Sequence, residues 1–513
     1  MNDSWISEYQ QSYGVFEAGG CSDHLRCRIR IKTDKLRVRK PFKFTNALTK
    51  DAGFLPLIQD YWARTEPIFH SNSVMYRFSK KLKMLKPSIK TMSKNKLGDL
   101  TRKTKDAYAI LCQAQLETLL NPSSLTMQTE STAYTRWLHL SDLEERYLKQ
   151  KSKLHWLKVG DGNNKAFHKA ATVREICNTI KEIKCQDGSI VDTQEEIKKE
   201  AERFFHDFLA HKPTDYQGIP VDDLRELMQY RCSEADGDLL EKEITPEEIK
   251  EVLFSMPRDK SPGPDGYTVE FLRETWPIVK QDFVTAVQSF FQYGFIPKGV
   301  NTTILALIPK KKTAREMKDY RPISCCNVIY KVISKLIANR LKKLLPDFIS
   351  PNQSAFVKDR LLMENVLLAS EIVKDYHKDT ISPRSAIKIG ISKAFDSVQW
   401  SFLISTLTAL NLPPRFIKWI ELCITTASFS VQVNGELAGL FCSERGLRQG
   451  CSLSPYLFVI CMQVLSEMLD KSAMEGKIGY HPQCQKLKLT HLCFADDLLV
   501  FTDGKKRSIE GIL

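Results

Sequence analysis

The chain has 513 residues, which is too long for one ordinary domain and predicts two to four units. Hydrophobic residues make up 42% of it, so the sequence can build real cores and is not that of a disordered protein. Lysine and arginine outnumber aspartate and glutamate by 75 to 61, and the net charge of +14 favours a polyanionic partner, nucleic acid first. Many ordinary basic proteins share such an excess, so charge alone leaves the partner open.

The 14 cysteines bear on the cellular compartment of the protein. None forms a C-x2-C or C-x4-C pair, which argues against a zinc site. Reduced, mostly buried thiols fit a nuclear or cytoplasmic protein, and the polar N-terminus lacks the form of a signal peptide. We therefore expect a protein that is not secreted. We also expect no membrane span, because no apolar run approaches the roughly 20 residues that a span requires.

The first predicted element is a β-strand at residues 25–31. Leu25, Cys27, Ile29 and Ile31 alternate with arginines, which predicts one buried face. A lone strand is not stable, so we expect the rest of its sheet to be missing from this chain.

A basic tract at residues 80–105 follows, with many lysines and one acid, Asp99. Two interpretations stay open for it: a solvated helix face, or a helix that lies along a phosphate backbone. Residues 106–170 are predicted to be helical. Their candidate core positions are Tyr108, Leu111, Leu116, Leu119, Trp137, Leu143, Tyr147 and Leu154.

From residue 180 the pattern changes. Residues 180–191 predict a hairpin closed by an Asp-Gly turn, and Thr193 followed by Glu196 is a capping box that opens a helix. A loop at 212–224 is a plausible linker. Thr245-Pro246 is a second helix start, with an N-cap hydroxyl and proline at the first position. The main catalytic domain is placed from there to the C-terminus.

The most informative motif is Phe-Ala-Asp-Asp at 494–497, which lies between apolar segments on both sides. Two apolar strands that meet at paired carboxylates predict a hairpin with acids at its tip. Adjacent acids at a buried turn are costly unless a cation neutralises them, and two-metal phosphoryl transfer requires such acids. An acidic surface turn is the alternative.

Two further motifs surround this one. The second motif is Gly-Leu-Arg-Gln-Gly-Cys-Ser-Leu-Ser-Pro at 446–455. Its glycines predict a tight loop whose backbone a ligand can approach closely. The apolar residues that follow predict a buried helix. Residues 387–398 predict a buried strand that turns into a helix.

Together these motifs resemble the reverse transcriptase of LINE-type (non-LTR) retrotransposon polyproteins. The resemblance covers roughly residues 240–513. It rests on seven motifs in order: Ser-Pro-Gly-Pro-Asp-Gly at 261–266, Leu-Ile-Pro-Lys at 307–310, Tyr-Arg-Pro-Ile-Ser at 320–324, Gln-Ser-Ala-Phe at 353–356, Lys-Ala-Phe-Asp at 393–396, the 446–455 loop and Phe-Ala-Asp-Asp at 494–497.

The resemblance extends upstream. Residues 156–168 are similar to the connector of LINE polyproteins of the kind abundant in plants. Asp23 and His24 resemble the last motif of their apurinic-type endonuclease, in which the histidine is the general base and the aspartate orients it. The bulk of that endonuclease is absent, so we expect no nuclease activity.

What the resemblance implies is an RNA-directed DNA polymerase that uses Mg2+, an RNA template, a DNA primer and deoxynucleotides. Asp496 and Asp497 would be the catalytic and metal-binding acids. Phe395 would be the gate that disfavours ribonucleotides. The remaining nucleotide-binding candidates are Arg448, Gln449 and Gly450 in the loop, and Lys310 and Arg321 in the fingers.

The chain departs from the family at one decisive position. The family strand reads Asp-x-x-Lys-Ala-Phe-Asp, so Gly390 stands where the aspartate that bridges both metals belongs. Asp396 lies six residues further on and is not an obvious rescue. A second departure is Asp359, where the family often has glycine. The chain also stops shortly after the Phe-Ala-Asp-Asp motif, so we expect no thumb.

These observations predict an α/β protein: an α+β palm with an antiparallel sheet and helical fingers, preceded by a mostly helical linker region. The predicted divisions are an endonuclease remnant at 1–31, a basic connector at 32–240 that is loosely tied to the palm, and reverse transcriptase fingers and palm at 241–513. The leading hypothesis is a polymerase fold with little or no activity. The alternatives are an active polymerase subunit and a non-catalytic nucleic-acid-binding remnant.

Overall fold

The computed structural model describes residues 13–17, 26–31, 40–152, 164–311, 313–378 and 382–512. The chain divides into two compact units, Met1–Lys40 and Pro41–Leu513, and each is considered by itself.

The first unit is an antiparallel pair of strands, β1 (Tyr13–Glu17) and β2 (Arg26–Arg30). The predicted strand is present, but its apolar face is not buried, because Ile29 is 61% and Ile31 53% exposed. Two strands make one thin layer, which cannot bury a face by itself.

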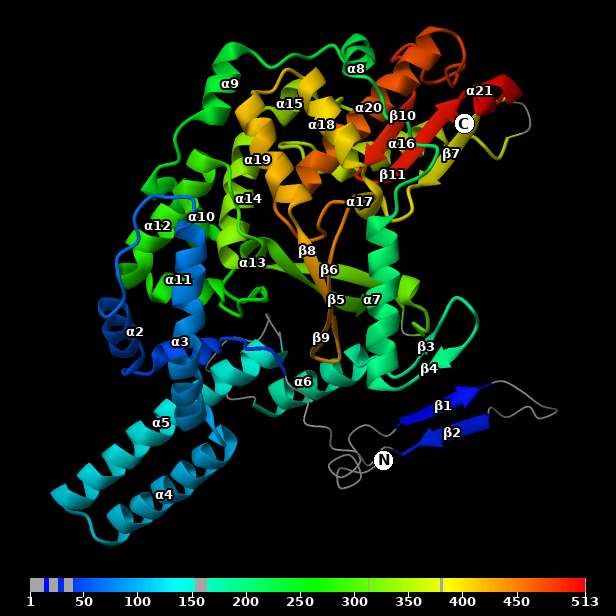
Figure 1. The fold of residues 1–513 in the computed structure, drawn as a ribbon. Helices are drawn as coiled ribbons and strands as arrows, with labels where there is room; N and C mark the ends of the chain where they lie inside the picture. Colours follow the sequence, from blue (N-terminus) through cyan, green and yellow to red (C-terminus); the bar gives the residue numbers. More distant parts are fainter. Residues whose placement is uncertain are drawn as a thin grey trace. The chain divides into compact units, whose positions relative to one another are not determined.

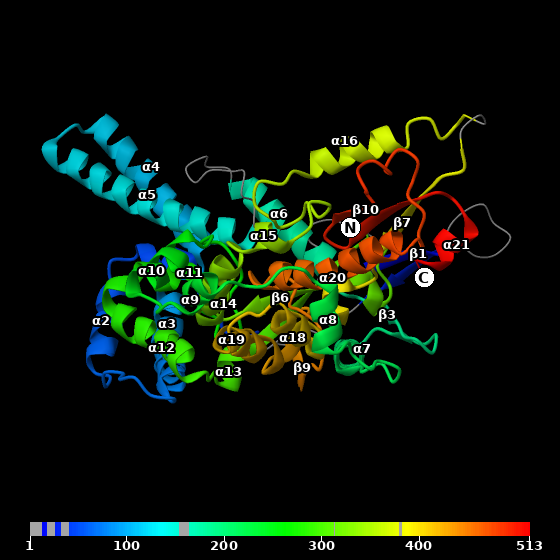
Figure 2. The same cartoon turned by 90° about the horizontal axis from the view of Figure 1, so that it is seen from above.

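A three-stranded palm sheet lies in the second unit, in the order β10 (His491–Phe494), β11 (Asp497–Thr502) and β7 (Ser385–Gly390), with both pairs antiparallel. Helix α20 (Ser454–Met474) packs on one face, where Leu469 and Ala473 join Leu498 and Val500 in one cluster. Helix α16 (Leu362–Ile372) packs on the other face (Figure 2). The predicted antiparallel palm sheet is thus confirmed.

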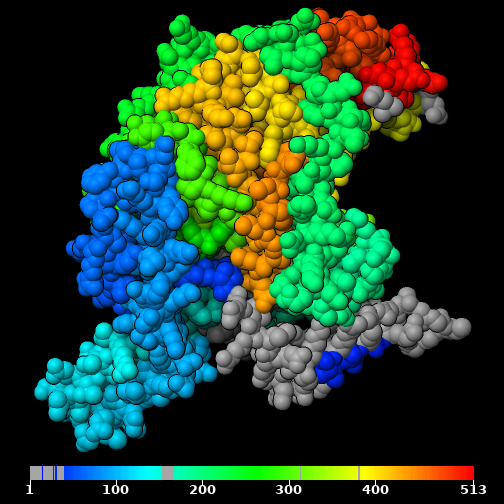
Figure 3. Space-filling model, viewed as in Figure 1, coloured from blue at the N-terminus to red at the C-terminus, as the bar shows by residue number. Residues whose placement is uncertain are grey.

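A four-stranded sheet forms a second layer, in the order β6 (Tyr320–Cys326), β5 (Thr302–Pro309), β8 (Ser428–Val433) and β9 (Glu436–Cys442). Strand β5 pairs with β6 antiparallel and with β8 parallel. Helix α7 (Gln194–Ala210) lies alongside β8 and β9 (Figures 1 and 3) and buries Phe205 in the same cluster as Val431.

The largest core joins the 32–240 segment to the predicted fingers. Phe44 and Phe54 pack on Phe271 with ring centroids 5.1 and 6.2 Å apart. Helix α3 (Val74–Leu97) brings Phe78 to 5.7 Å from Phe283 of α12 (Trp276–Tyr293). Packing is therefore continuous across residue 240.

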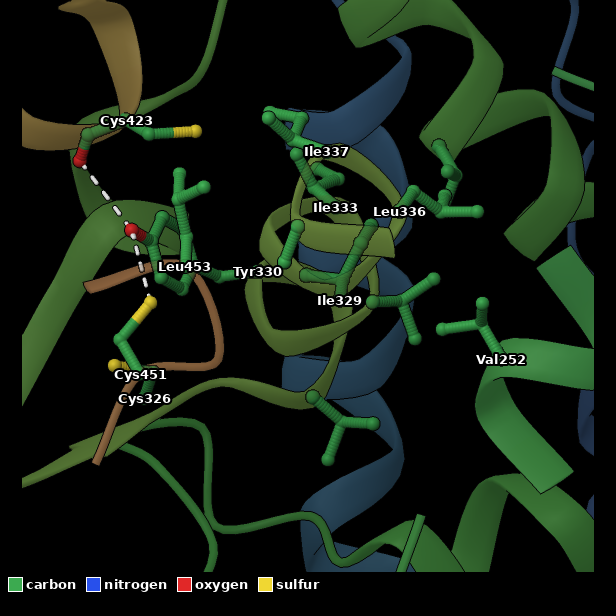
Figure 4. Packing of buried hydrophobic residues seen from close by; sticks show 14 of the residues in the cluster. Val252, Cys326, Ile329, Tyr330, Ile333, Leu336, Ile337, Cys423, Cys451 and Leu453 are labelled. Carbon is green, nitrogen blue, oxygen red and sulfur yellow. Dashed lines mark hydrogen bonds between the residues drawn. The ribbon is translucent and has the colours of Figure 1, made fainter. Parts of the chain in front are cut away.

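Helix α14 (Val328–Leu341) lies at the centre of this core (Figure 4). Its residues Val328, Val332, Leu336 and Leu341 are all buried. The hydroxyl of Tyr330 donates to the carbonyl of Cys423 at 3.4 Å and approaches the sulfur of Cys451 at 3.9 Å. This polar end ties the helix to the loop that follows β9.

Helices α4 (Leu100–Leu120) and α5 (Ser124–Ser152) form an antiparallel hairpin. Leu111 and Leu143 are buried, as predicted, but Tyr108 is 52%, Leu116 56% and Leu119 80% exposed. The core assignment of those three was wrong, because two helices can hide only one stripe each from water. Leu154 lies outside the described residues.

The predicted helix starts and the predicted Asp-Gly turn are confirmed. The hydroxyls of Thr193 and Thr245 accept hydrogen bonds from the backbone N–H of Glu196 and Glu248, and Gly188 has φ +87° in the turn of the β3–β4 hairpin. The remaining elements are η1 (Asn46–Lys50), α2 (Phe54–Ala63), α6 (Asn164–Asn178), β3 (Ile183–Lys184), β4 (Ile190–Val191), α8 (Val221–Leu227), α9 (Glu234–Glu241), α10 (Pro246–Ser255), α11 (Val269–Glu274), α13 (Lys298–Asn301), η2 (Met317–Asp319), α15 (Leu345–Phe348), α17 (Ala394–Ser397), α18 (Trp400–Ala409), α19 (Pro414–Thr425) and α21 (Lys506–Glu510).

One smaller expectation needs correction. Met468 of α20 is 47% exposed, so the helix after the 446–455 loop is not buried all round. Among the described helices, none combines the length and the apolar composition that crossing a bilayer would require.

Candidate functional site

The turn between β10 and β11 carries the two adjacent acids. Only Ala495 and Asp496 connect the strands, whose register runs from Phe494 opposite Asp497 to His491 opposite Val500. Ala495 has φ +54°, a left-handed conformation that costs an L-residue about 1–2 kcal/mol. A turn under such strain needs outside support.

Gln353 supplies this support from a different part of the chain. Its buried amide oxygen accepts hydrogen bonds from the backbone N–H groups of Ala495 and Ala355, both at 3.0 Å. Its amide nitrogen donates to the carbonyl of Ala495 at 3.4 Å. Since both backbone groups of Ala495 are met by one side chain, the turn is fixed in place.

The loop that carries Gln353 is itself held by Arg360. This guanidinium donates to the carbonyls of Ile349 and Ser350 at 2.6 Å and to that of Gln353 at 2.9 Å. Asp359, just before it, has φ +61°, which is the conformation that glycine adopts most easily. Aspartate is among the few residues with a side chain that tolerate this conformation.

Gly390 lies beside the acidic turn. It is the pairing partner of Asp497 across β7 and β11, and the next N–H, of Ile391, donates to the carbonyl of Asp496 at 3.4 Å. Gly390 is exposed, and a Cβ built on it would meet no atom within 4 Å. The strand position beside the acids therefore has room for a side chain, but glycine supplies no oxygen ligand there.

The carboxylates at this end of the sheet are few. Asp496 is partly exposed, and the exposed Asp497 forms an ion pair with the equally exposed Lys388 at 3.5 Å. Such surface pairs contribute little. Within the part of the chain that the structure describes, no three histidine, cysteine, aspartate or glutamate side chains gather as a metal-binding group. Two carboxylates could hold one divalent ion, but the donor set for a two-ion site is incomplete.

Asp396 is engaged elsewhere. Its carboxylate is 9% exposed and accepts a hydrogen bond from the side-chain amide of Gln449 at 2.8 Å. Burial raises the pKa of Asp396 to about 6, although nearby Lys393 and Lys310 act in the opposite direction. This acid orients the loop at 446–455 and does not join Asp496 and Asp497 in a metal-binding group.

Lys393 and Phe395 face different partners. The Lys393 ammonium lies 3.7 Å from the ring centroid of Phe208 on α7, and burial lowers its pKa. Phe395, the candidate gate, stacks on Phe458 of α20 at 4.6 Å. Its carbonyl accepts from the N–H of Leu447 at 2.6 Å, which joins α17 to the loop.

In the loop at 446–455, Gly450 and Ser452 are exposed and Gln449 is partly exposed. The carbonyl of Gln449 accepts from the N–H of Ser324 on β6 at 2.9 Å, and Gly450 is exposed with φ +98°. Arg448 turns inward: its guanidinium is buried, donates to Asn301 at 2.6 Å and lies 4.3 Å from the ring of Tyr330. Arg448 therefore supports the loop from inside.

The two candidate cations of the fingers lie at one end of the β5–β6 pair. Lys310 and Arg321 are both exposed, Arg321 stands opposite Ile308, and the Lys310 ammonium donates to the carbonyl of Lys318 at 2.9 Å. Since Lys310 also influences the pKa of Asp396, this end of the hairpin is close to the loop.

Several of these placements had no sequence signal. Gln353 and Arg360 belong to or follow a matched motif, yet nothing local indicates that they hold a turn far along the chain. The seating of α7 on Lys393 through Phe208 was also not predicted. Asp23 and His24, the candidate endonuclease residues, lie outside the described residues, as do most of residues 156–168.

Comparison with known proteins adds the family. Residues 308–513 match the family described as "Reverse transcriptase (RNA-dependent DNA polymerase)". The chain is similar to the "Transposon TX1 uncharacterized 149 kDa protein" of Xenopus laevis, with 30% identity over 62% of this chain and 24% of the relative.

Two fly proteins are also similar. The "Retrovirus-related Pol polyprotein from type-2 retrotransposable element R2DM" of Drosophila melanogaster is 27% identical over 56% of this chain and 27% of its own length. The "RNA-directed DNA polymerase from mobile element jockey", also of Drosophila melanogaster, is 25% identical over 50% of this chain and 28% of its own. The chain thus spans about a quarter of the length of these relatives.

Proposed function

We propose a function from one premise: the chain carries a reverse transcriptase domain, related to those of non-LTR retrotransposon polyproteins. The domain keeps the architecture of an RNA-directed DNA polymerase, but it has lost nucleotidyl transfer. Reverse transcriptases use divalent metal ions. We propose that the ion is Mg2+, with Asp496 and Asp497 as its remaining ligands and RNA template, DNA primer and deoxynucleotides as its former partners.

The pairing of Gly390 with Asp497 carries this proposal. It puts glycine on the strand next to the acidic turn, where the family motif has an aspartate, and no other described acid completes the group. A carboxylate at that point would neutralise charge on the ions and place the primer oxygen. Loss of about 3 kcal/mol of transition-state stabilisation already slows a reaction more than a hundredfold.

The remaining residues are proposed to keep nucleotide contacts. Gln449 and Gly450 are accessible on the loop, and Phe395 stands behind it as the gate. Lys310 and Arg321 are exposed cations that suit a triphosphate. Arg448 is left out of this group because its guanidinium is buried against Asn301.

The test is primer extension on an RNA template with Mg2+ or Mn2+. The unchanged chain should incorporate nucleotides at background level. Gly390→Asp should raise incorporation by at least about a hundredfold over the unchanged chain, because the new carboxylate enters open space and restores the third ligand. Product formation is read on a sequencing gel.

A matched control is Gly390→Asn, which has nearly the same shape without the charge and should stay at background. Adding Asp496→Ala to Gly390→Asp should abolish any gain. If the unchanged chain extends primers well above background and Asp496→Ala stops it, the domain is active and the proposal of inactivity fails.

A further inference from the structure

A basic groove lies outside the palm. Residues 42–48, α3 and α5 enclose a space of about 330 Å³, and none of its lining residues belongs to the palm sheet. We call it the lysine groove. The lining residues that bear on its chemistry are Phe42, Lys43, Lys90, Ser93, Lys94 and Tyr147.

The cations of α3 fall into two groups. Lys81 pairs with the buried Asp282 at 2.6 Å and Lys96 with Asp51 at 3.0 Å, and these pairs help to join α3 to its neighbours. Lys90 and Lys94, which line the lysine groove, have no carboxylate within 4.0 Å in the described part of the chain. Positive charge is therefore balanced where α3 packs and left unbalanced where the groove opens.

Like charges crowd one another along this face. Burial lowers the pKa of Lys86. The charge of Asp265 raises this pKa, and the neighbouring Lys90 and Lys83 lower it again. Placing several cations of one sign within two turns of a helix destabilises the free protein, and a bound anion would relieve this repulsion.

Aromatic rings stand among these lysines. The ring centroid of Phe42 lies 5.4 Å from the ammonium of Lys86 and 6.0 Å from that of Lys90, and its edge packs on Tyr267 at 5.4 Å. Tyr147 lines the lysine groove from α5. Ammonium groups bind phosphates, and aromatic faces stack on bases, so the two together suit a polynucleotide whose bases are unpaired.

We propose that the lysine groove binds a single polynucleotide strand, with backbone phosphates at Lys90 and Lys94 and a base against Phe42 or Tyr147. The volume accommodates about one nucleotide, at the lower end of ordinary ligand pockets. A duplex suits the groove less, because its bases are already stacked and paired. The site is independent of nucleotidyl transfer, so an inactive palm does not affect it.

The test uses the full chain and fluorescence anisotropy with labelled oligouridylate, oligodeoxythymidylate and a duplex of about 20 nucleotides each, at about 50 and about 200 mM salt. Lys90→Gln combined with Lys94→Gln should raise Kd for a single strand about tenfold at the lower salt. The slope of log K against log salt should fall by about 1.4, since each phosphate contact on a single strand contributes about 0.7. Comparison of the two oligonucleotides decides between RNA and DNA.

The matched control is Lys250→Gln combined with Lys280→Gln, two exposed lysines of α10 and α12 with the same change in net charge. It should leave Kd within about twofold, because neither lysine lines the lysine groove. A loss that depends only on total charge would appear equally in both variants. Tyr147→Leu keeps an apolar side chain in the lysine groove. It should weaken the binding of a single strand at least about fivefold and leave the binding of the duplex unchanged. Urea unfolding of each variant confirms that the fold is intact.

Three results would overturn the proposal. The groove and control variants could lose affinity equally, which would show unspecific attraction. The duplex could bind as tightly as the single strands, with no effect of Tyr147→Leu. Polyglutamate of equal charge could displace the oligonucleotide as well as unlabelled strand does, which would indicate an acidic protein partner.

Discussion

A carboxylate held away from water makes the loop at 446–455 sensitive to pH. Burial raises the pKa of Asp396 to about 6 in the folded chain, against 3.8 for an ordinary aspartate. Below pH 4 the group is protonated in both the folded and the unfolded state. Between pH 4 and 6 only the folded state holds the proton. The free energy of unfolding therefore falls as pH rises through this range, by about 3 kcal/mol in all.

The prediction concerns Asp396→Asn, which resembles the protonated acid at every pH. Its free energy of unfolding relative to the unchanged chain should increase between pH 4 and 6 and level off above. Urea unfolding at pH 4.5 and 7.5 measures the difference. Asp375→Asn is a suitable control, because a hydrogen bond from Lys378 lowers the pKa of that exposed acid. A relative stability of Asp396→Asn that does not change with pH would contradict the burial argument.

At this scale the sequence predicts positions better than contacts. The resemblance to the family strand motif implies a place for Gly390 beside the acids, and Gly390 pairs with Asp497. Gln353 is different, since the backbone that it supports lies 142 residues away. Arg448 shows the opposite difficulty: a loop arginine is expected to be exposed, but Asn301 and Tyr330 hold it inside.

Among the elements, α7 contacts the segment that follows β7 through an aromatic residue, Phe208. The Lys393 ammonium lies over the ring of Phe208, and Arg445 lies over it at 4.8 Å and donates to its carbonyl at 2.8 Å. Cation–π contacts of partly desolvated groups are worth about 1–2 kcal/mol. The contact is thus strong enough to couple α7 to the strand that ends at Gly390.

A double-mutant cycle with Phe208→Leu and Lys393→Met tests this coupling. The coupling free energy should be about 1–2 kcal/mol by urea unfolding, because each change alone removes the same contact. The pair Phe204→Leu and Lys393→Met is the comparison, since that ring centroid is 4.9 Å from the ammonium and should couple more weakly. Additive changes at Phe208 would show that α7 is held by its apolar face alone.

Helix starts with local signals could be predicted, whereas the four-stranded sheet could not. The N-caps Thr193 and Thr245 act within four residues of sequence, so their helices could be recognised. The β8–β9 hairpin has a local signal, the Asn434-Gly435 turn between its strands. The parallel pairing of β8 with β5, more than a hundred residues earlier, has none. Leu116 and Leu119 follow a helical period but face water, because periodicity shows a stripe and not what covers it.

For the whole second unit, packing argues against an independent module at 241–513. Phe44, Phe54 and Phe78 are all buried, and they cover Phe271 and Phe283 on the other side of residue 240. Burying one such side chain contributes about 1.5–3 kcal/mol. Losing all three would remove roughly 5–9 kcal/mol, a large share of the 5–15 kcal/mol that usually stabilises a protein.

A fragment of residues 241–513 should therefore unfold at much lower urea than a fragment of residues 41–513, and should bind the dye ANS in buffer. Tryptophan fluorescence during urea titration measures both midpoints. The longer fragment keeps every contact of the second unit, so it controls for the loss of Met1–Lys40. Equal midpoints would mean that α2 and α3 lie on a core that is complete without them. A lower midpoint would show that the basic connector is structurally part of the polymerase domain.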